Sequence, residues 1–384
     1  EFFLFCVGLQ INNYFFIYCI FNIGDNMNDD ELFKSINDDF SSKMDDKDSS
    51  SFKSFKNMNN SFDIDNPSMI VEDKNNPKSI FEIREALEKF RELEISSNSK
   101  DFTNKDKIND IRSFLSSGII LEEIPFHSDF IEGISSFLIS NGFSLDFVVD
   151  NLKDMEGHVL PVEYLYGGKA QALRNHIDLE LDFFDYDEDG KVTGVSKEKE
   201  ELYKHVVVHE FFHKLSSYKN GHRDIMVMGD ALLEGFTDYF TKRVLNDGVE
   251  SDLYGFPVKV CDLFTEMIGI DKTLDDYINH TGEFPNLKGL FNECGLDQEG
   301  FIQFSTTISS VISGVSRDKK SGLPKEEWGL DEKTCTLDFL RESILIPYCR
   351  NNPDKAESVL NKFNNLFSDM GYICSMEDVK SSTK

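Results

Sequence analysis

The chain has 384 residues, with 70 Asp or Glu against 40 Lys or Arg, so its formal net charge is −30. Binding to nucleic acid requires clustered lysine and arginine, and no contiguous basic stretch is present. We therefore expect no nucleic-acid partner. The length suits one large or two modest domains. The seven cysteines are scattered and include no Cys-x-x-Cys pair, which predicts thiols rather than a disulfide framework.

Residues 1–26 form an apolar leader that is long enough to span a membrane. The leader begins at Glu1, has no Lys or Arg before its apolar run, and ends just before Met27. Three interpretations fit: translation from upstream of a true start at Met27, a signal peptide or anchor whose beginning is missing, or a buried helix. The protein is cytoplasmic under the first interpretation and secreted or membrane-anchored under the second. Membrane association depends on the same choice.

Residues 27–79 are dominated by Asp, Ser, Asn and Lys, with isolated phenylalanines and no sustained period. Such a segment buries too little apolar surface to offset the entropy of ordering it. We therefore expect a disordered acidic linker.

A helical N-terminal region is predicted over residues 80–155. Apolar residues recur at helical spacing in 80–90. The stretches 114–124 and 137–147 share a pattern in which a helix ends at glycine and restarts after an acidic or polar turn. This pattern is typical of a small helical repeat, although two copies do not define an array.

Alternation of apolar and acidic residues from Ile177 to Phe183 predicts a half-buried strand, with 191–193 returning as its partner. The segment from Asp185 to Gly190 has oxygens at the first, third and fifth positions and glycine at the sixth, as in a calcium-binding loop. The twelfth position is Ser196 rather than glutamate. Calcium binding and an acidic hairpin turn are the two interpretations.

The sequence from 207 to 213 reads Val-Val-His-Glu-Phe-Phe-His. Four residues advance a helix by roughly 400°, so His209 and His213 project from nearly the same face, one turn apart. Two imidazoles in this arrangement can bind one metal ion. Glu210 is next to the first histidine and can reach a water on that ion, which is the geometry that metal-assisted hydrolysis requires. His205 lies one turn earlier and could join a row of three histidines, but we expect a surface residue or one that orients a ligand.

A second helix is predicted from Asp230, a suitable N-cap, to Val244. Glu234 and Asp238 share one face of it. Glu234 can complete a site of two histidines and one glutamate. Asp238, one turn later, can accept the outward N–H of a metal-bound histidine and so fix its tautomer.

These residues resemble the gluzincin metallopeptidases, the thermolysin-like group, whose signature is His-Glu-x-x-His followed by Glu-x-x-x-Asp. The resemblance covers about residues 200–247. It implies that His209, His213 and Glu234 bind Zn²⁺, that Glu210 is the catalytic general base, and that Asp238 orients a ligand. It also implies that a strand ahead of the zinc helix binds extended substrate along its edge, a role for which Ile177 to Phe183 is the candidate.

The chain departs from the gluzincin pattern at two positions. Lys214 follows the second histidine, where a small or apolar residue is usual, and Leu233 replaces the common asparagine before the third ligand. No Gly-x-Met-Glu-Asn stretch for holding a free amino terminus is present, which favours an endopeptidase. The metzincin plan is disfavoured, because Ser216 and Lys219 stand where glycine and histidine would continue its motif.

Short helices are predicted in the C-terminal part, over 257–268, 285–294, 301–312, 331–349 and 355–367. A hydrolase of this type also needs a donor that stabilises the oxyanion. Tyr254 is the preferred candidate, with Tyr277 and His280 as alternatives.

The sequence thus predicts an α+β protein with a zincin-like catalytic core over 156–250 and a mostly helical C-terminal subdomain over 251–384. A small sheet would precede the active-site helix. The expected function is that of a zinc-dependent metallopeptidase, a hydrolase that cleaves peptide or protein substrates through a zinc-activated water. The alternative is a catalytically inactive zinc-binding or interaction protein.

Overall fold

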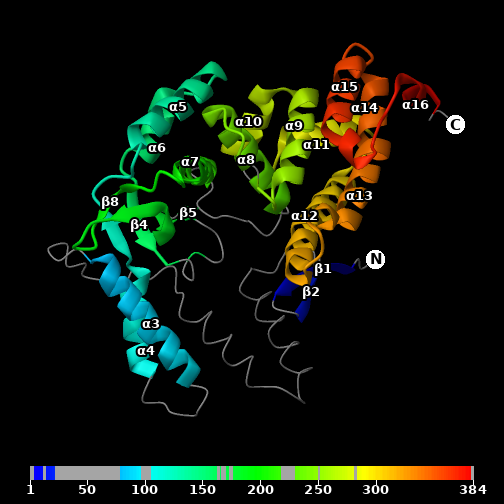
Figure 1. Ribbon diagram of the computed structural model, residues 1–384. Helices are drawn as coiled ribbons and strands as arrows, with labels where there is room; N and C mark the ends of the chain where they lie inside the picture. The colour runs from blue at the N-terminus through cyan, green and yellow to red at the C-terminus, as the bar shows by residue number, and fades with distance from the viewer. Residues whose placement is uncertain are drawn as a thin grey trace. The chain divides into compact units, whose positions relative to one another are not determined.

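The computed structural model describes residues 4–11, 14–21, 78–96, 105–161, 165, 170–172, 176–217, 230–249, 251–280 and 283–381. The chain divides into two compact units, Glu1–Asn75 and Asn76–Lys384. In the first unit, strands β1 (Leu4–Ile11) and β2 (Tyr14–Phe21) pair antiparallel (Figure 1).

The described residues of the apolar leader are therefore a pair of strands, and the interpretation of this stretch as a buried helix is wrong. Its sequence is rich in aromatic and β-branched residues, which fit a pleated strand well. No helix within the described ranges is both long enough and apolar enough to cross a membrane. The predicted disordered linker lies outside the described residues, apart from residues 78 and 79.

The second unit starts with the predicted helical region. Its helices are α3 (Ile80–Ser96), α4 (Lys105–Ser116), α5 (His127–Ser140) and α6 (Leu145–Leu152). A capping box begins α3: the Ser79 N–H donates to Glu82 Oε2 at 2.8 Å, and the Glu82 N–H donates to Ser79 Oγ at 3.3 Å. The Asp146 N–H donates to Ser144 Oγ at 3.1 Å and so caps α6.

The expected helical repeat is correct in one copy only. The second copy matches, since α5 ends at Ser140 and α6 begins at Leu145. In the first copy the chain after Gly118 forms strand β3 (Ile119–Leu121) instead of a second helix. This strand pairs antiparallel with β4 and buries Ile119 and Leu121, so pairing in the sheet overrides the local helical pattern.

A four-stranded sheet has the order β3-β4-β6-β5, with β4 (Glu156–Leu160), β5 (Ala170–Ala172) and β6 (His176–Glu180). Strands β4 and β6 run parallel, and the other neighbours run antiparallel. The expectation that Ile177 to Phe183 forms the substrate-binding edge is wrong, because β6 lies between β4 and β5. The edge strands of this sheet are β3 and β5, and β5 is an edge that contacts α7 (Glu200–Ser217).

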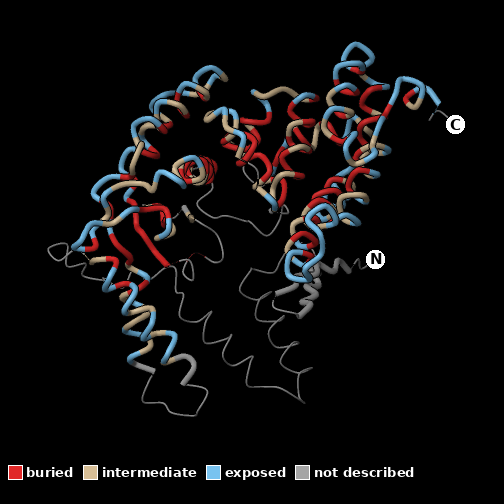
Figure 2. The backbone as a smooth tube through the Cα atoms, viewed as in Figure 1, coloured by how far each residue is buried: buried red, intermediate tan, exposed pale blue. Residues whose placement is uncertain are grey.

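Apolar and polar side chains alternate along β4 and β6, so the two faces of the sheet differ. Val159, Ile177 and Leu179 are fully buried on one face of β4 and β6. His158 and Asp178 belong to the opposite face, since successive side chains of a strand point to opposite sides. Figure 2 shows that both strands are buried over most of their length.

A separate hairpin joins β7 (Phe184–Tyr186) and β8 (Val192–Val195). The predicted pairing of 191–193 with the preceding strand is therefore wrong, because a 3₁₀ turn at Leu181–Phe183 ends β6 and starts a new ladder. The acidic hairpin turn is confirmed. Asp187 Oδ1 accepts the N–H groups of Asp189 at 3.0 Å and of Lys191 at 2.9 Å, so this carboxylate oxygen bonds the backbone of the turn.

Helices α7 (Glu200–Ser217) and α8 (Asp230–Leu245) carry the His-Glu-x-x-His and Glu-x-x-x-Asp residues and pack against each other. Both are buried on most sides, as the tube of α7 shows in Figure 2. Aromatic side chains fill the space around them. Phe212 and Phe240 have ring centroids 5.8 Å apart, and Tyr277 lies 5.3 Å from Phe240. This packing fixes both helices in position and rotation.

The C-terminal part is helical, as predicted. It comprises α9 (Gly255–Ile268), α10 (Ile270–Asn279), α11 (Pro285–Glu293), α12 (Gln298–Ser321), α13 (Leu330–Phe339), α14 (Ile346–Asn351), α15 (Ala356–Phe367) and α16 (Met376–Ser381). A π-helical segment, Leu340–Leu345, joins α13 to α14. The predicted stretches lie within helices to within one residue at their ends, and 331–349 runs through α13, the π-helical segment and α14. Helices α10 and α16 are additional.

The second unit is thus mixed α+β and mostly helical, with a small sheet ahead of α7. The five cysteines within its described residues are free thiols, in agreement with the sequence. Its subdivision at residues 155 and 250 stays a prediction.

Gly118 tests the packing of the sheet, because its backbone has φ +59° and an added Cβ would lie 2.5 Å from Leu160 Cδ2. Alanine at this position must also move the Val159 carbonyl oxygen, which would lie 2.7 Å away. We expect Gly118→Ala to lower the free energy of unfolding by about 2–3 kcal/mol, measured by urea denaturation. Gly142 is the control, since its φ is +91° but nothing lies within 4 Å of an added Cβ. Gly142→Ala should cost only about 1 kcal/mol, and equal losses in the two variants would contradict the packing described.

Candidate metal centre

His209 and His213 lie on one side of α7 because they are one helical turn apart, and packing of the other sides determines where this side faces. Val208, Phe211 and Phe212 are fully buried in the core, and this fixes the rotation of the helix. Both histidines are themselves buried, which is unusual for two imidazoles unless their nitrogens have partners.

Three side-chain tips from α7 and α8 converge on one point, as the sequence predicted. His209 Nε2 lies 3.1 Å from His213 Nε2 and 3.1 Å from Glu234 Oε2, and His213 Nε2 lies 3.2 Å from the same oxygen. Three atoms bound to one tetrahedral ion at about 2.0–2.1 Å are about 3.3 Å apart. The observed triangle therefore has nearly the size and shape that a metal ion requires.

Hydrogen bonds can serve at most two edges of this triangle at once, because each ring nitrogen carries at most one proton and Glu234 Oε2, when ionised, only accepts. Without a proton on either of them, the two nitrogens would repel at 3.1 Å. A single cation near the axis of the triangle interacts with all three atoms at once.

Asp238 lies on the side of the His209 ring that faces away from this triangle. Its Oδ1 is 3.6 Å from His209 Nδ1, on the edge of the ring opposite the converging Nε2. Asp238 is almost completely buried, and Lys242 lies 3.6 Å from its Oδ2. The predicted position of Asp238, where it orients a ligand histidine, agrees with this geometry.

His205 connects Asp238 to a further carboxylate, that of Asp247. It is buried rather than on the surface, with Nε2 2.6 Å from Asp238 Oδ1 and Nδ1 2.9 Å from Asp247 Oδ2. His205 thus holds Asp238 in place. The sequence drew attention to His205 because it lies one helical turn before His209. Asp247 follows α8, and nothing in the local sequence pattern identifies it as a partner of His205.

The charges of the centre stabilise one another. Burial alone would lower the pKa of His209, but the carboxylates of Asp238, Glu234 and Glu210 raise it to about 10. Burial would likewise raise the pKa of Glu234, yet His213 and His209 hold it well below its usual range. The pKa of Asp238 is lowered by His205 and His209 against the same effect of burial. The site therefore favours positive charge, supplied by a proton or by a metal ion that displaces it.

The remaining predicted residues differ in their access to the centre. Glu210 is half-buried next to His209, and its charge helps to raise the pKa of that histidine. Tyr254 stacks on His209, with ring centroids 6.0 Å apart and planes 12° apart. Tyr277 is fully buried and bonds Thr237 Oγ1 at 2.7 Å, which leaves Tyr254 as the tyrosine beside the centre.

Two further groups of potential ligands occur within the described residues. One is His205 with His209 and Asp238, in which His205 Nε2 already contacts Asp238 Oδ1 directly at 2.6 Å. The other is His158 with His176 and Asp178 on the sheet, which the sequence analysis did not single out. No local motif marks this group, because its members come together only through the pairing of two strands.

Comparisons of this chain with protein-family models, with curated proteins and with solved structures find no match. The fold and the site define a mixed α+β, mostly helical protein with buried His, Asp and Glu groups that can hold a metal ion.

The position of Asp238 behind His209 leads to a paired prediction. Asp238→Asn removes the charge that orients His209, so we expect zinc affinity to fall by about 10–100-fold in a chelator competition assay. Asp247→Asn is the matched control, because it alters the other carboxylate of His205 without touching a metal ligand. We expect less than about a threefold change there. A similar loss in the two variants would contradict a specific role of Asp238 in orienting His209.

Proposed function

We propose that the protein is a zinc-dependent metallopeptidase. The convergence of His209, His213 and Glu234 at 3.1–3.2 Å is the observation that supports it most strongly. Two imidazoles and one carboxylate are the ligand set of catalytic zinc sites in hydrolases, and three protein ligands leave a coordination position open for water. Nitrogen donors also disfavour calcium and magnesium, which prefer oxygen ligands.

The edge strand β5 supports a peptide as the substrate. It contacts α7, and within the described ranges no strand other than β6 pairs with it. The outer backbone groups of such an edge can pair with an extended peptide and place it along the catalytic helix. A peptide that binds by its backbone needs no free terminus, and the chain lacks the aminopeptidase stretch noted above. An endopeptidase follows from these two features.

The side chains of the centre have distinct roles under this proposal. Zinc, when bound, supplies a Lewis acid that acidifies a water molecule and polarises the peptide carbonyl. Glu210 accepts the proton of the attacking water and passes it to the leaving amine. The Tyr254 hydroxyl donates to the developing oxyanion. Asp238 holds His209 in the orientation needed for binding.

Glu210→Gln tests the catalytic assignment, because glutamine keeps the size of the side chain but cannot accept the proton. We expect zinc content to be unchanged and turnover of a peptide library to fall by about 10²–10⁴-fold, measured by mass spectrometry of the products.

Glu201→Gln is the matched control, since Glu201 is an exposed glutamate in the first turn of the same helix. It should cleave as the wild type does. Equal activity of Glu210→Gln and wild type would refute the role of Glu210. A zinc-loaded wild type that cleaves nothing in the library would favour an inactive zinc-binding protein.

A further inference from the structure

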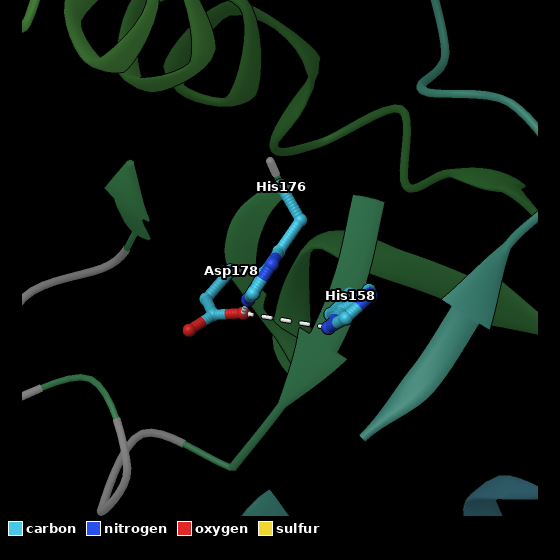
Figure 3. A group of neighbouring side chains, drawn as sticks. All are labelled: His158, His176 and Asp178. Carbon is cyan, nitrogen blue, oxygen red and sulfur yellow. Dashed lines mark ion pairs between the residues drawn. The ribbon is translucent and has the colours of Figure 1, made fainter. Parts of the chain in front are cut away.

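The parallel pairing of β4 and β6 brings four ionisable side chains onto one face of the sheet. In the register of the two strands, Glu156 is opposite His176 and His158 is opposite Asp178. Residues two apart on a strand share a face, so the four side chains form a square. Figure 3 shows His158 beside His176 and Asp178, with the two β6 residues next to each other.

Three of these side chains come within reach of one ion. Asp178 Oδ1 lies 3.2 Å from His176 Nε2 and 3.8 Å from His158 Nδ1. The exposed fractions of Asp178 and His158 are only 5% and 7%. A carboxylate and two imidazoles are thus gathered away from bulk water, where ionisable groups need strong partners.

The Asp178 carboxylate is buried with one oxygen that accepts no hydrogen bond. This oxygen is Oδ1, although His176 Nε2 lies 3.2 Å away and His158 Nδ1 lies 3.8 Å away. A buried carboxylate oxygen without a hydrogen bond is costly and calls for an explanation. A cation bound to this oxygen and to the two nearby ring nitrogens would provide one.

We propose that His158, His176 and Asp178 form a second metal site, specific for a divalent transition ion such as zinc. Imidazole nitrogens suit zinc and its neighbours in the first transition row, whereas calcium and magnesium prefer oxygen. The ligand atoms are His158 Nδ1, His176 Nε2 and Asp178 Oδ1. This site shares no residue with the centre on α7 and α8, so it stands or falls independently of the proposed peptidase activity.

Glu156 lies near the other nitrogen of the His158 ring, the one that would not bind the metal. Its Oε2 lies 3.8 Å from His158 Nε2, where the outward N–H of a metal-bound imidazole would point. A carboxylate in this position fixes the tautomer that presents Nδ1 to the ion. The site would then tie two parallel strands together next to the edge strand β5.

Metal binding requires one local movement. The rings of His158 and His176 are stacked, with centroids 4.0 Å apart and planes 18° apart. Imidazole donates in the plane of its ring, so one ring must turn about its Cβ–Cγ bond for both nitrogens to face the ion. That torsion has a broad distribution in histidine, so the ring can turn without leaving a favoured side-chain conformation.

The test is the number of zinc ions retained per chain, measured by native mass spectrometry and elemental analysis after loading with zinc alone. We expect about two for the full wild-type chain, and about one for His176→Ala and for Asp178→Asn. Asp178→Asn keeps the shape of the side chain and so guards against a loss caused by misfolding. His280→Ala is the matched control, because His280 is 43% exposed and belongs to neither site, and it should retain about two.

His213→Ala separates this proposal from that of the peptidase. It should lower the zinc content by about one ion, and His176→Ala with His213→Ala should abolish retention. Zinc retention that is the same in wild type, His176→Ala and Asp178→Asn would overturn the second site. If His213→Ala alone left retention unchanged while His176→Ala reduced it, the second site would be supported and the centre on α7 and α8 refuted.

Discussion

The packing of α7 against α8 is the constraint on which the centre depends. Burying an imidazole or a carboxylate without partners costs several kcal/mol, and this protein buries His205, His209, His213 and Asp238 within two helices. The cost is offset only where opposite charges or an ion lie within a few ångström. The aromatic core around Phe212 and Phe240 holds the helices so that these distances are met. A shift of either helix by a fraction of a turn would separate the ligand tips.

The two groups of histidines show how far sequence reasoning reaches. His209, His213, Glu234 and Asp238 could be predicted, since helical spacing alone places each pair on one face. Their convergence also requires the angle between α7 and α8, which depends on packing along both helices. The group at His158 could not be predicted, because its members are brought together by strand register and are separated by a crossover that sequence does not specify.

The errors in the predicted fold share this cause. Ile119 and Leu121 follow a helix and a glycine, and their local pattern resembles that of the next helix. Pairing with β4 makes them a strand instead. β6 was expected at the edge of the sheet because the gluzincin resemblance implies a substrate-binding edge strand ahead of the zinc helix, and its alternation of apolar and acidic residues predicted one solvated face. Its acidic alternation arises partly from Asp178, which is buried on a polar face rather than exposed to water. Long amphipathic helices such as α12 and α15 can be predicted from their own sequence, because their apolar periodicity does not depend on pairing with another segment.

Anomalous diffraction at the zinc absorption edge, from crystals of the zinc-loaded protein, would test the central claim most directly. The account predicts a peak about 2.0–2.2 Å from each of His209 Nε2, His213 Nε2 and Glu234 Oε2. Side chains of this triangle resolved without a peak between them, in crystals shown to contain zinc, would contradict it.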